Sequence, residues 1–160
     1  MAKWGSVDFR EFKALQKRLE VLQQADLQKF CEAVSKELAA RLLAKVIKRT
    51  PTRKPENCPP GVVGGTLKRG WTGGVNQNAK AYADSLSVRQ IGDDYVIEVK
   101  NPVEYASYVE FGHRTRGGGG QGWVEGFFML TKSEMELESQ MPKIIENKLL
   151  NLFGDIFNGK

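Results

Sequence analysis

Chemistry in this chain would most readily involve its single histidine, His113. A catalytic histidine needs a nucleophile or a carboxylate that the fold holds beside it. Glu104 and Glu110 are near in sequence, but nothing in their spacing pairs either of them with the imidazole. Glu110, beside Arg114 and Arg116, is more simply interpreted as an ion pair or a subunit contact. We therefore expect no catalytic residues and no enzymatic activity.

Four consecutive glycines, Gly117 to Gly120, follow this basic segment. A phosphate-binding loop would continue into Gly-Lys-Ser or Gly-Lys-Thr at a strand-to-helix switch, and this one does not. We expect no nucleotide or other cofactor here. Because glycine loses the most backbone entropy on ordering, the tetrad is interpreted as an arm that orders on a neighbouring subunit.

Aromatic residues flank the glycines on both sides. Tyr105 and Tyr108 precede them, and Trp123, Phe127 and Phe128 follow them. Such residues either anchor a returning segment in the core or form a hot spot that docks into another subunit. The sequence leaves both interpretations open.

Composition excludes several classes of protein. With 160 residues and 41% hydrophobic residues, the chain can build one domain with a real core. Its net charge of +5 permits contact with nucleic acid or an acidic protein but requires neither. We expect no membrane span, because no apolar run approaches the necessary ~18–20 residues. Cys31 and Cys58 fit a reducing compartment, and without CxxC or HxxxH spacing we expect no metal site.

The N-terminal third, residues 1–50, is predicted to be helical. Asp8 with Glu11 resembles a capping box, and apolar residues then recur at helical spacing to Leu22. A second, longer amphipathic helix is predicted from Leu27 to Arg49, ending where Thr50 precedes a proline.

The middle of the chain is predicted to hold a small antiparallel sheet. Residues 51–66 form a Pro/Gly-rich loop, expected to be flexible, and residues 67–75 are interpreted as a short strand with Trp71 in the core. Residues 76–83 are expected to be a polar connection. A β-hairpin is predicted from segments 85–91 and 95–100, which alternate apolar and polar residues.

The remainder of the chain completes an α+β plan in one domain, residues 1–160. A short helix ends at Gly112, within residues 67–130 that hold the hairpin, this helix and the glycine arm. A C-terminal helix (131–160) begins at Thr131 or Ser133, and Pro142 should kink or divide it.

A basic patch is predicted at the end of the long helix and in the loop after it. Cations at a helix C-terminus suit its dipole, which is one interpretation. The other is a surface that faces DNA or an acidic neighbour. The patch comprises Arg41, Lys45, Lys48, Arg49, Arg53 and Lys54.

Four segments, in order, resemble one protein family, the neck or tail-completion proteins of long-tailed bacteriophages, similar in role to minor tail protein Z of phage lambda. The resemblance covers most of residues 30–150 and departs from the family at an insertion, residues 52–64. The matching segments are Thr50-Pro51, Gly65-Thr66-Leu67-Lys68-Arg69-Gly70-Trp71, Asn101-Pro102-Val103-Glu104-Tyr105-Ala106-Ser107-Tyr108-Val109-Glu110-Phe111-Gly112 and Phe128-Met129.

The resemblance implies a structural virion protein, made in the host cytoplasm, that completes the head-proximal end of the tail and joins it to the head connector. It implies a homo-oligomeric ring, six- or twelve-fold, that contacts tail-tube, terminator or connector proteins and meets channel DNA without reading its sequence. A tail terminator, a head-closure ring component and a small basic DNA-binding module remain alternatives. The residues expected at subunit contacts are Tyr105, Tyr108, Glu110, Phe111, His113, Arg114, Arg116, Trp123 and Phe127.

Overall fold

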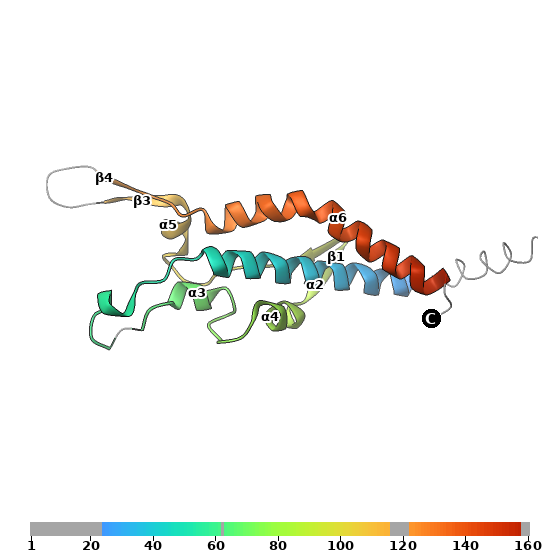
Figure 1. Ribbon diagram of the computed structural model, residues 1–160, viewed down its shortest axis with the longest axis horizontal. Coiled ribbons are helices and arrows are strands. Elements are labelled where there is room, and N and C mark those ends of the chain that lie inside the picture. Colours follow the sequence, from blue (N-terminus) through green and yellow to red (C-terminus); the bar gives the residue numbers. More distant parts are fainter. Residues whose placement is uncertain (1–23, 62, 116–121, 158–160) are drawn as a thin grey trace, which may run out of the picture.

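The computed structural model describes residues 24–61, 63–115 and 122–157, and it has the expected α+β architecture (Figure 1). The first expected helix, the glycine tetrad and Arg116 lie outside the described residues. In chain order the elements are α2 (Gln24–Arg49), the 3-10 turn η1 (Pro55–Asn57), α3 (Thr66–Gly70), α4 (Ala79–Ser85), β1 (Val88–Ile91), β2 (Asp94–Ile97), α5 (Ala106–Phe111), β3 (Gly112–Thr115), β4 (Gly122–Glu125) and α6 (Met129–Phe157).

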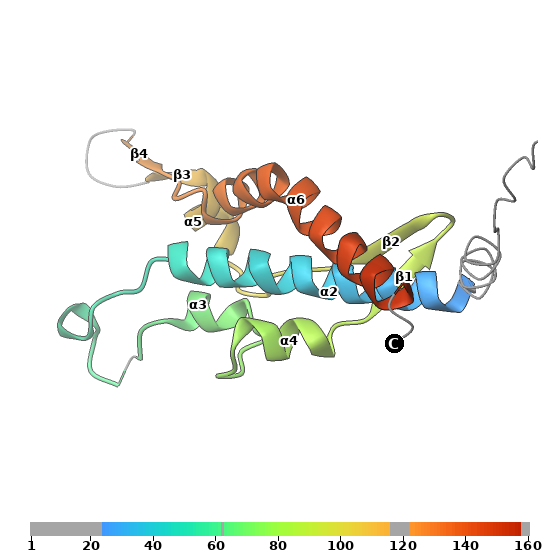
Figure 2. The same ribbon diagram turned by 45° about the vertical axis from the view of Figure 1, so that its right-hand side comes forward.

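Helix α2 is the central element, packed against α4, α6 and the β1–β2 hairpin (Figure 2). Ala39, Leu43 and Val46 recur at spacings of four and three, which places them on one face, and all three are buried. The long helix predicted from sequence is confirmed. It begins at Gln24 and ends at Arg49. The end is as expected, because Thr50 precedes Pro51 and the residue before a proline avoids the helical conformation.

Trp71 ties the end of α2 to the segment that follows α3. Its side chain is buried, as predicted, and its Nε1 donates a hydrogen bond to the Thr50 hydroxyl at 2.8 Å. The Thr50 hydroxyl in turn donates to the Val46 carbonyl at 2.7 Å. The buried polar atoms in this link are therefore paired, as burial requires.

Two predictions for the middle of the chain are wrong. The segment predicted as a strand contains α3, because Leu67 and Trp71 face the core four positions apart, which is helical spacing. The expected polar connection contains α4, which Asn78 caps by accepting a hydrogen bond from the Ala81 N–H at 2.8 Å.

The predicted β1–β2 hairpin is confirmed. Its strands pair antiparallel with Val88 opposite Ile97, and Gly92, at φ 63°, allows the tight turn. The hairpin rests on α2, with Ile97 packed against the core. The β3 and β4 strands form a second, separate sheet, where the sequence predicted a single small one.

Helix α6 is one continuous helix that contains Pro142 and runs alongside α2. It begins at Met129, earlier than either predicted start. Its ribbon bends partway along, as a proline inside a helix produces, and it is not divided in two (Figure 2). Among the described residues, no helix is long and apolar enough to cross a membrane.

Candidate subunit interface

Glu110 on α5 is buried and joins this short helix to α6. Its carboxylate accepts hydrogen bonds from the Leu130 N–H (2.9 Å), the Thr131 N–H (2.9 Å) and the Thr131 hydroxyl (2.8 Å). These N–H groups belong to the first turn of α6, which lacks partners within the helix. Phe128 precedes α6 and has no acceptor in its side chain, so Glu110 supplies the cap from another element.

The sequence predicts that Glu110 forms an ion pair with Arg114 or Arg116, or that it lies at a subunit contact. The structure places its carboxylate inside the chain instead, 5% exposed and fully engaged with α6. No sequence signal reveals this role, because the capped helix begins almost twenty residues further along the chain.

Two glycines let the chain pass closely around the end of α5. A Cβ on Gly126 would lie 2.1 Å from the Glu110 carbonyl oxygen, and one on Gly112 (φ 84°) would lie 2.3 Å from the Val124 carbonyl oxygen. The Phe127 N–H donates to the Val109 carbonyl at 2.8 Å, and the Phe128 N–H donates to the Glu110 carbonyl at 3.0 Å. The base of the β3–β4 hairpin is therefore fixed to α5 by backbone contacts.

Large aromatic side chains are exposed around this junction. Phe111 and Trp123 are each 60% exposed. Contiguous exposed apolar surface on a small protein marks a site of interaction, since scattered single residues are the norm. We call the following group the aromatic end: Tyr105, Tyr108, Phe111, Trp123, Phe127 and Phe128.

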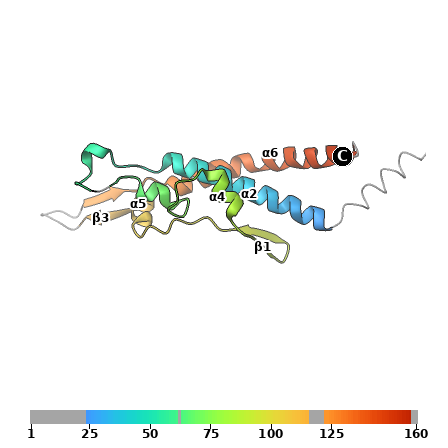
Figure 3. The same cartoon turned by 90° about the horizontal axis from the view of Figure 1, so that it is seen from below.

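The β3–β4 hairpin, which we call the arm, extends beyond the C-terminal end of α2 (Figures 1 and 3). All four residues of β4 are exposed, and Trp123 pairs directly across from Arg114. Cross-strand partners share a face, so this aromatic ring and this cation lie on the same side of the arm. A two-stranded hairpin without a packed face is marginally stable in water, so the arm lacks the support that α2 gives to β1–β2.

His113 lies beside the aromatic end. Its ring meets the Tyr108 ring edge-to-face, with centroids 5.8 Å apart. Its Nδ1 is covered and has no hydrogen-bond partner among the described residues. The geometry thus makes His113 part of an aromatic cluster, with no carboxylate hydrogen-bonded to Nδ1.

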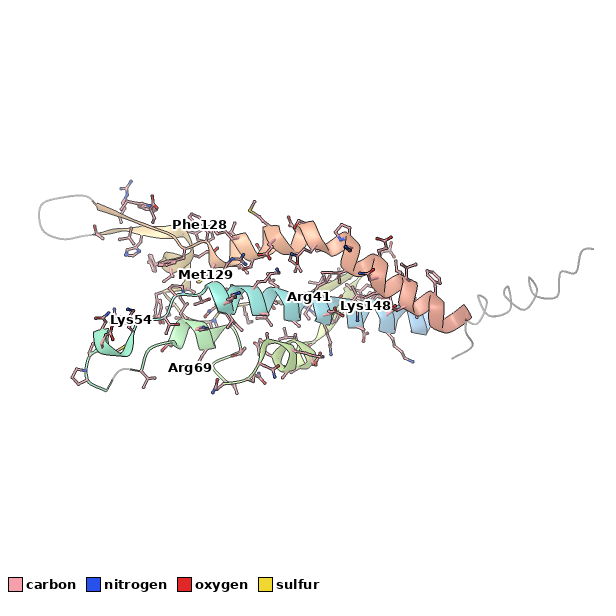
Figure 4. All side chains as sticks on the ribbon, viewed as in Figure 1. Arg41, Lys54, Arg69, Phe128, Met129 and Lys148 are labelled. Atoms are coloured by element: carbon pink, nitrogen blue, oxygen red, sulfur yellow. The ribbon has the colours of Figure 1, made fainter. Side chains whose placement is uncertain are left out.

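The predicted basic patch is divided by internal ion pairs. Lys45 and Arg49 both bind Glu136 of α6, and Arg49 also donates to the Ser133 hydroxyl at 3.0 Å. Arg41 pairs with Glu37 at 2.7 Å. Figure 4 shows Arg41 midway along α2 and Lys54 in the loop beyond its end, where Lys54 pairs with Glu56 at 3.7 Å.

These ion pairs shift the acidity of their carboxyl groups. Hydrogen bonds from Lys45 and then Arg49 lower the pKa of Glu136 to about 2. The neighbouring Glu134 behaves oppositely. Partial burial, followed by repulsion from Glu110 and Glu138, raises its pKa above the ordinary value. The described residues contain no cluster of three or more His, Cys, Asp or Glu side chains that could hold a metal ion.

The fold therefore defines a small α+β protein whose most distinctive surface is an exposed aromatic end suited to protein contacts. Residues 13–112 match the family described as "Bacteriophage HK97-gp10, putative tail-component", and the chain belongs to that family. No curated protein and no solved structure is significantly similar to the chain.

The match ends at Gly112, whereas the sequence resemblance was expected to reach about residue 150. The arm after its first residue, Gly112, and all of α6 thus lie beyond the matched residues. Within the matched residues, two of the segments that resemble the family contact each other: the segment that contains α3 and the segment that begins at Asn101. Gly70 packs against Asn101, whose Nδ2 donates to the Leu67 carbonyl at 2.8 Å.

Proposed function

We propose that this phage tail component completes the head-proximal end of the tail and joins it to the head connector as a homo-oligomeric ring in the virion. The exposed aromatic end carries the proposal. A monomer gains nothing from leaving six large rings in water, whereas a subunit that contacts neighbours buries them. The family match also supports the proposal, because the family is described as a tail component.

The mechanism we propose is ordered docking of subunits without catalysis. The aromatic end supplies the contacts, together with Arg114 and His113. Glu110 instead holds α5 against α6, and so fixes the orientation of Tyr108 and Phe111, which α5 carries on its exposed side. Partners would be further copies in six- or twelve-fold symmetry and the adjoining tube, terminator or connector proteins.

DNA binding by the isolated chain is the weaker alternative. Lys45 and Arg49 pair with Glu136, Arg41 pairs with Glu37 and Lys54 pairs with Glu56, so four of the six residues of the basic patch are already paired. Lys48 and Arg53 would remain to line a channel and contact DNA without reading its sequence. Steeply salt-dependent binding of duplex DNA by the monomer would favour a DNA-binding module over an assembly role.

Electron microscopy of particles made without this gene tests the proposal. Full heads beside separate tails of normal length support neck joining. Tails of uncontrolled length would instead identify a terminator, and normal virions would contradict any assembly role.

Complementation sharpens the result. A copy carrying Phe111→Ser should fail to restore joining, whereas Ile91→Ser should restore it. Ile91 on β1 is 61% exposed, as Phe111 is 60% exposed, but it lies away from the aromatic end. Equal restoration of joining by both copies would show that the aromatic end is not needed for assembly.

A further inference from the structure

A second apolar surface lies between α2, β2 and the first turns of α6. It encloses a cavity of about 420 Å³, with Leu38 and Leu42 of α2 and Val96 of β2 among its mostly aliphatic lining residues. This volume falls within the roughly 300–1,000 Å³ typical of binding pockets. We call it the aliphatic groove. Val96 is 37% exposed, so the groove opens to solvent.

Two acidic side chains are among the residues that line the aliphatic groove. Glu98 and Glu134 are among its lining residues, together with one basic residue, Arg89. Partial burial, and then repulsion from Glu110 and Glu138, raise the pKa of Glu134, so an added positive charge would stabilise its carboxylate. A partner that brings both an apolar side chain and a positive charge would suit this surface.

The arm has that combination on one face. Trp123 is 60% exposed and pairs across the hairpin with the exposed cation Arg114. The aliphatic groove suits it better than the cavity beside residues 51–66, because Glu98 and Glu134 line the groove, whereas the described residues that line that cavity include no carboxylate.

We propose that the arm of one copy docks in the aliphatic groove of the next copy, with Trp123 against Leu42 and Val96 and with Arg114 beside Glu134. The occupant is a second copy because the arm points away from its own groove, past the end of α2 (Figures 1 and 3). An arm at one end and a groove midway along the molecule make a heterologous, head-to-tail contact, the type of contact that forms a ring when the rotation between successive copies closes. The inference rests on the proposed function and names the contact within it.

Mixing two defective variants of the full chain tests this head-to-tail contact. Trp123→Asp removes the arm's anchor, and Val96→Asp places a charge in the groove. Each variant alone should remain a monomer in sedimentation velocity, but their mixture keeps one intact interface and should form a one-to-one dimer and nothing larger. Val75→Asp, at a 57% exposed residue outside the groove, is the control and should assemble as the wild type does.

Charge reversal tests the polar part. Arg114→Glu and Glu134→Arg should each weaken association at least about tenfold, and the double variant should recover most of that loss. Additive weakening in the double variant would overturn the pairing.

The remaining outcomes also decide the matter. Rings formed by Trp123→Asp alone would overturn this contact while leaving the proposed ring intact. A wild-type chain that stays monomeric would overturn it as well, and the virion phenotype would still test the proposed function separately. If Val96→Asp destabilises the monomer as a core substitution does, the groove is covered within its own chain and the inference is wrong.

Discussion

The two hairpins of this protein have strands of equal length but different surroundings. Each pairs two four-residue strands antiparallel. The β1–β2 hairpin rests on α2, and Ile97 packs against the core. The arm is fixed to α5 by backbone contacts at its base, and its Trp123 side chain is 60% exposed. The local structure of a hairpin therefore does not determine its role in this protein. The first hairpin belongs to the fold, whereas the second is a surface that the fold presents.

The sharpest way to break this contrast is to disturb the base of the arm. Gly126→Ala would place a Cβ 2.1 Å from the Glu110 carbonyl oxygen, and a backbone atom cannot swing aside. We expect a loss of about 2–3 kcal/mol in unfolding free energy, measured by urea denaturation. Gly154→Ala, with no atom within 4 Å of its Cβ in α6, should instead stabilise by up to about 1 kcal/mol. Similar losses in both variants would show that close packing at the base does not fix the arm.

Removing the cap that Glu110 provides should have the next largest effect. Glu110→Ala leaves two N–H groups of α6 without their acceptor, so we expect a loss of about 2 kcal/mol. Glu104→Ala, at an exposed residue just before α5, is the matched control and should change stability by less than about 0.5 kcal/mol. If both variants unfold with the same m-value, the difference between their denaturation midpoints is due to stability alone.

A matched pair of truncations compares the hairpins directly. Ile97→Ala should cost about 1–2 kcal/mol, because this side chain packs against the core. Val124→Ala, at a 42% exposed residue, should change the unfolding free energy of the monomer by less than about 0.5 kcal/mol. Equal costs would mean that the arm is as much a part of the folded body as the first hairpin.

The smallest expected effect is the pH dependence of the Glu136 ion pairs. The folded-state pKa is about 2 and the ordinary value is 4.5, so the unfolded state binds the proton more readily. The stabilisation is complete above about pH 4.5 and disappears as the pH falls through about 2. The difference in stability between wild type and Glu136→Gln should therefore shrink across that interval. A difference that stays constant through it would contradict the assigned ion pairs.

Periodicity and turn chemistry were sufficient to predict α2, the β1–β2 hairpin and the short helix ending at Gly112. They failed where distant contacts decide the local structure. A single helical turn with Leu67 and Trp71 was mistaken for a strand, because so short a segment shows little periodicity. The start of α6 was placed too late, because its cap comes from Glu110 in another element.

The candidate interface was only partly predictable. The sequence identifies the aromatic residues but does not predict that they are exposed. Aromatic residues on either side of a loop can equally well pack in the core. The sequence does not show that Lys45 and Arg49 are paired, because Glu136, which binds both, lies 91 and 87 residues away from them. Charge density along the sequence therefore overstated the basic surface.

Hydrogen exchange in the free chain and in assembled particles tests the central claim most directly. In the free chain, the amides of β1–β2 should exchange slowly and those of Gly112–Thr115 and Gly122–Glu125 quickly, because only the first hairpin has a packed face. On assembly, the arm should become protected while β1–β2 changes little. An arm already protected in the free chain, or still unprotected in the particle, would contradict the account.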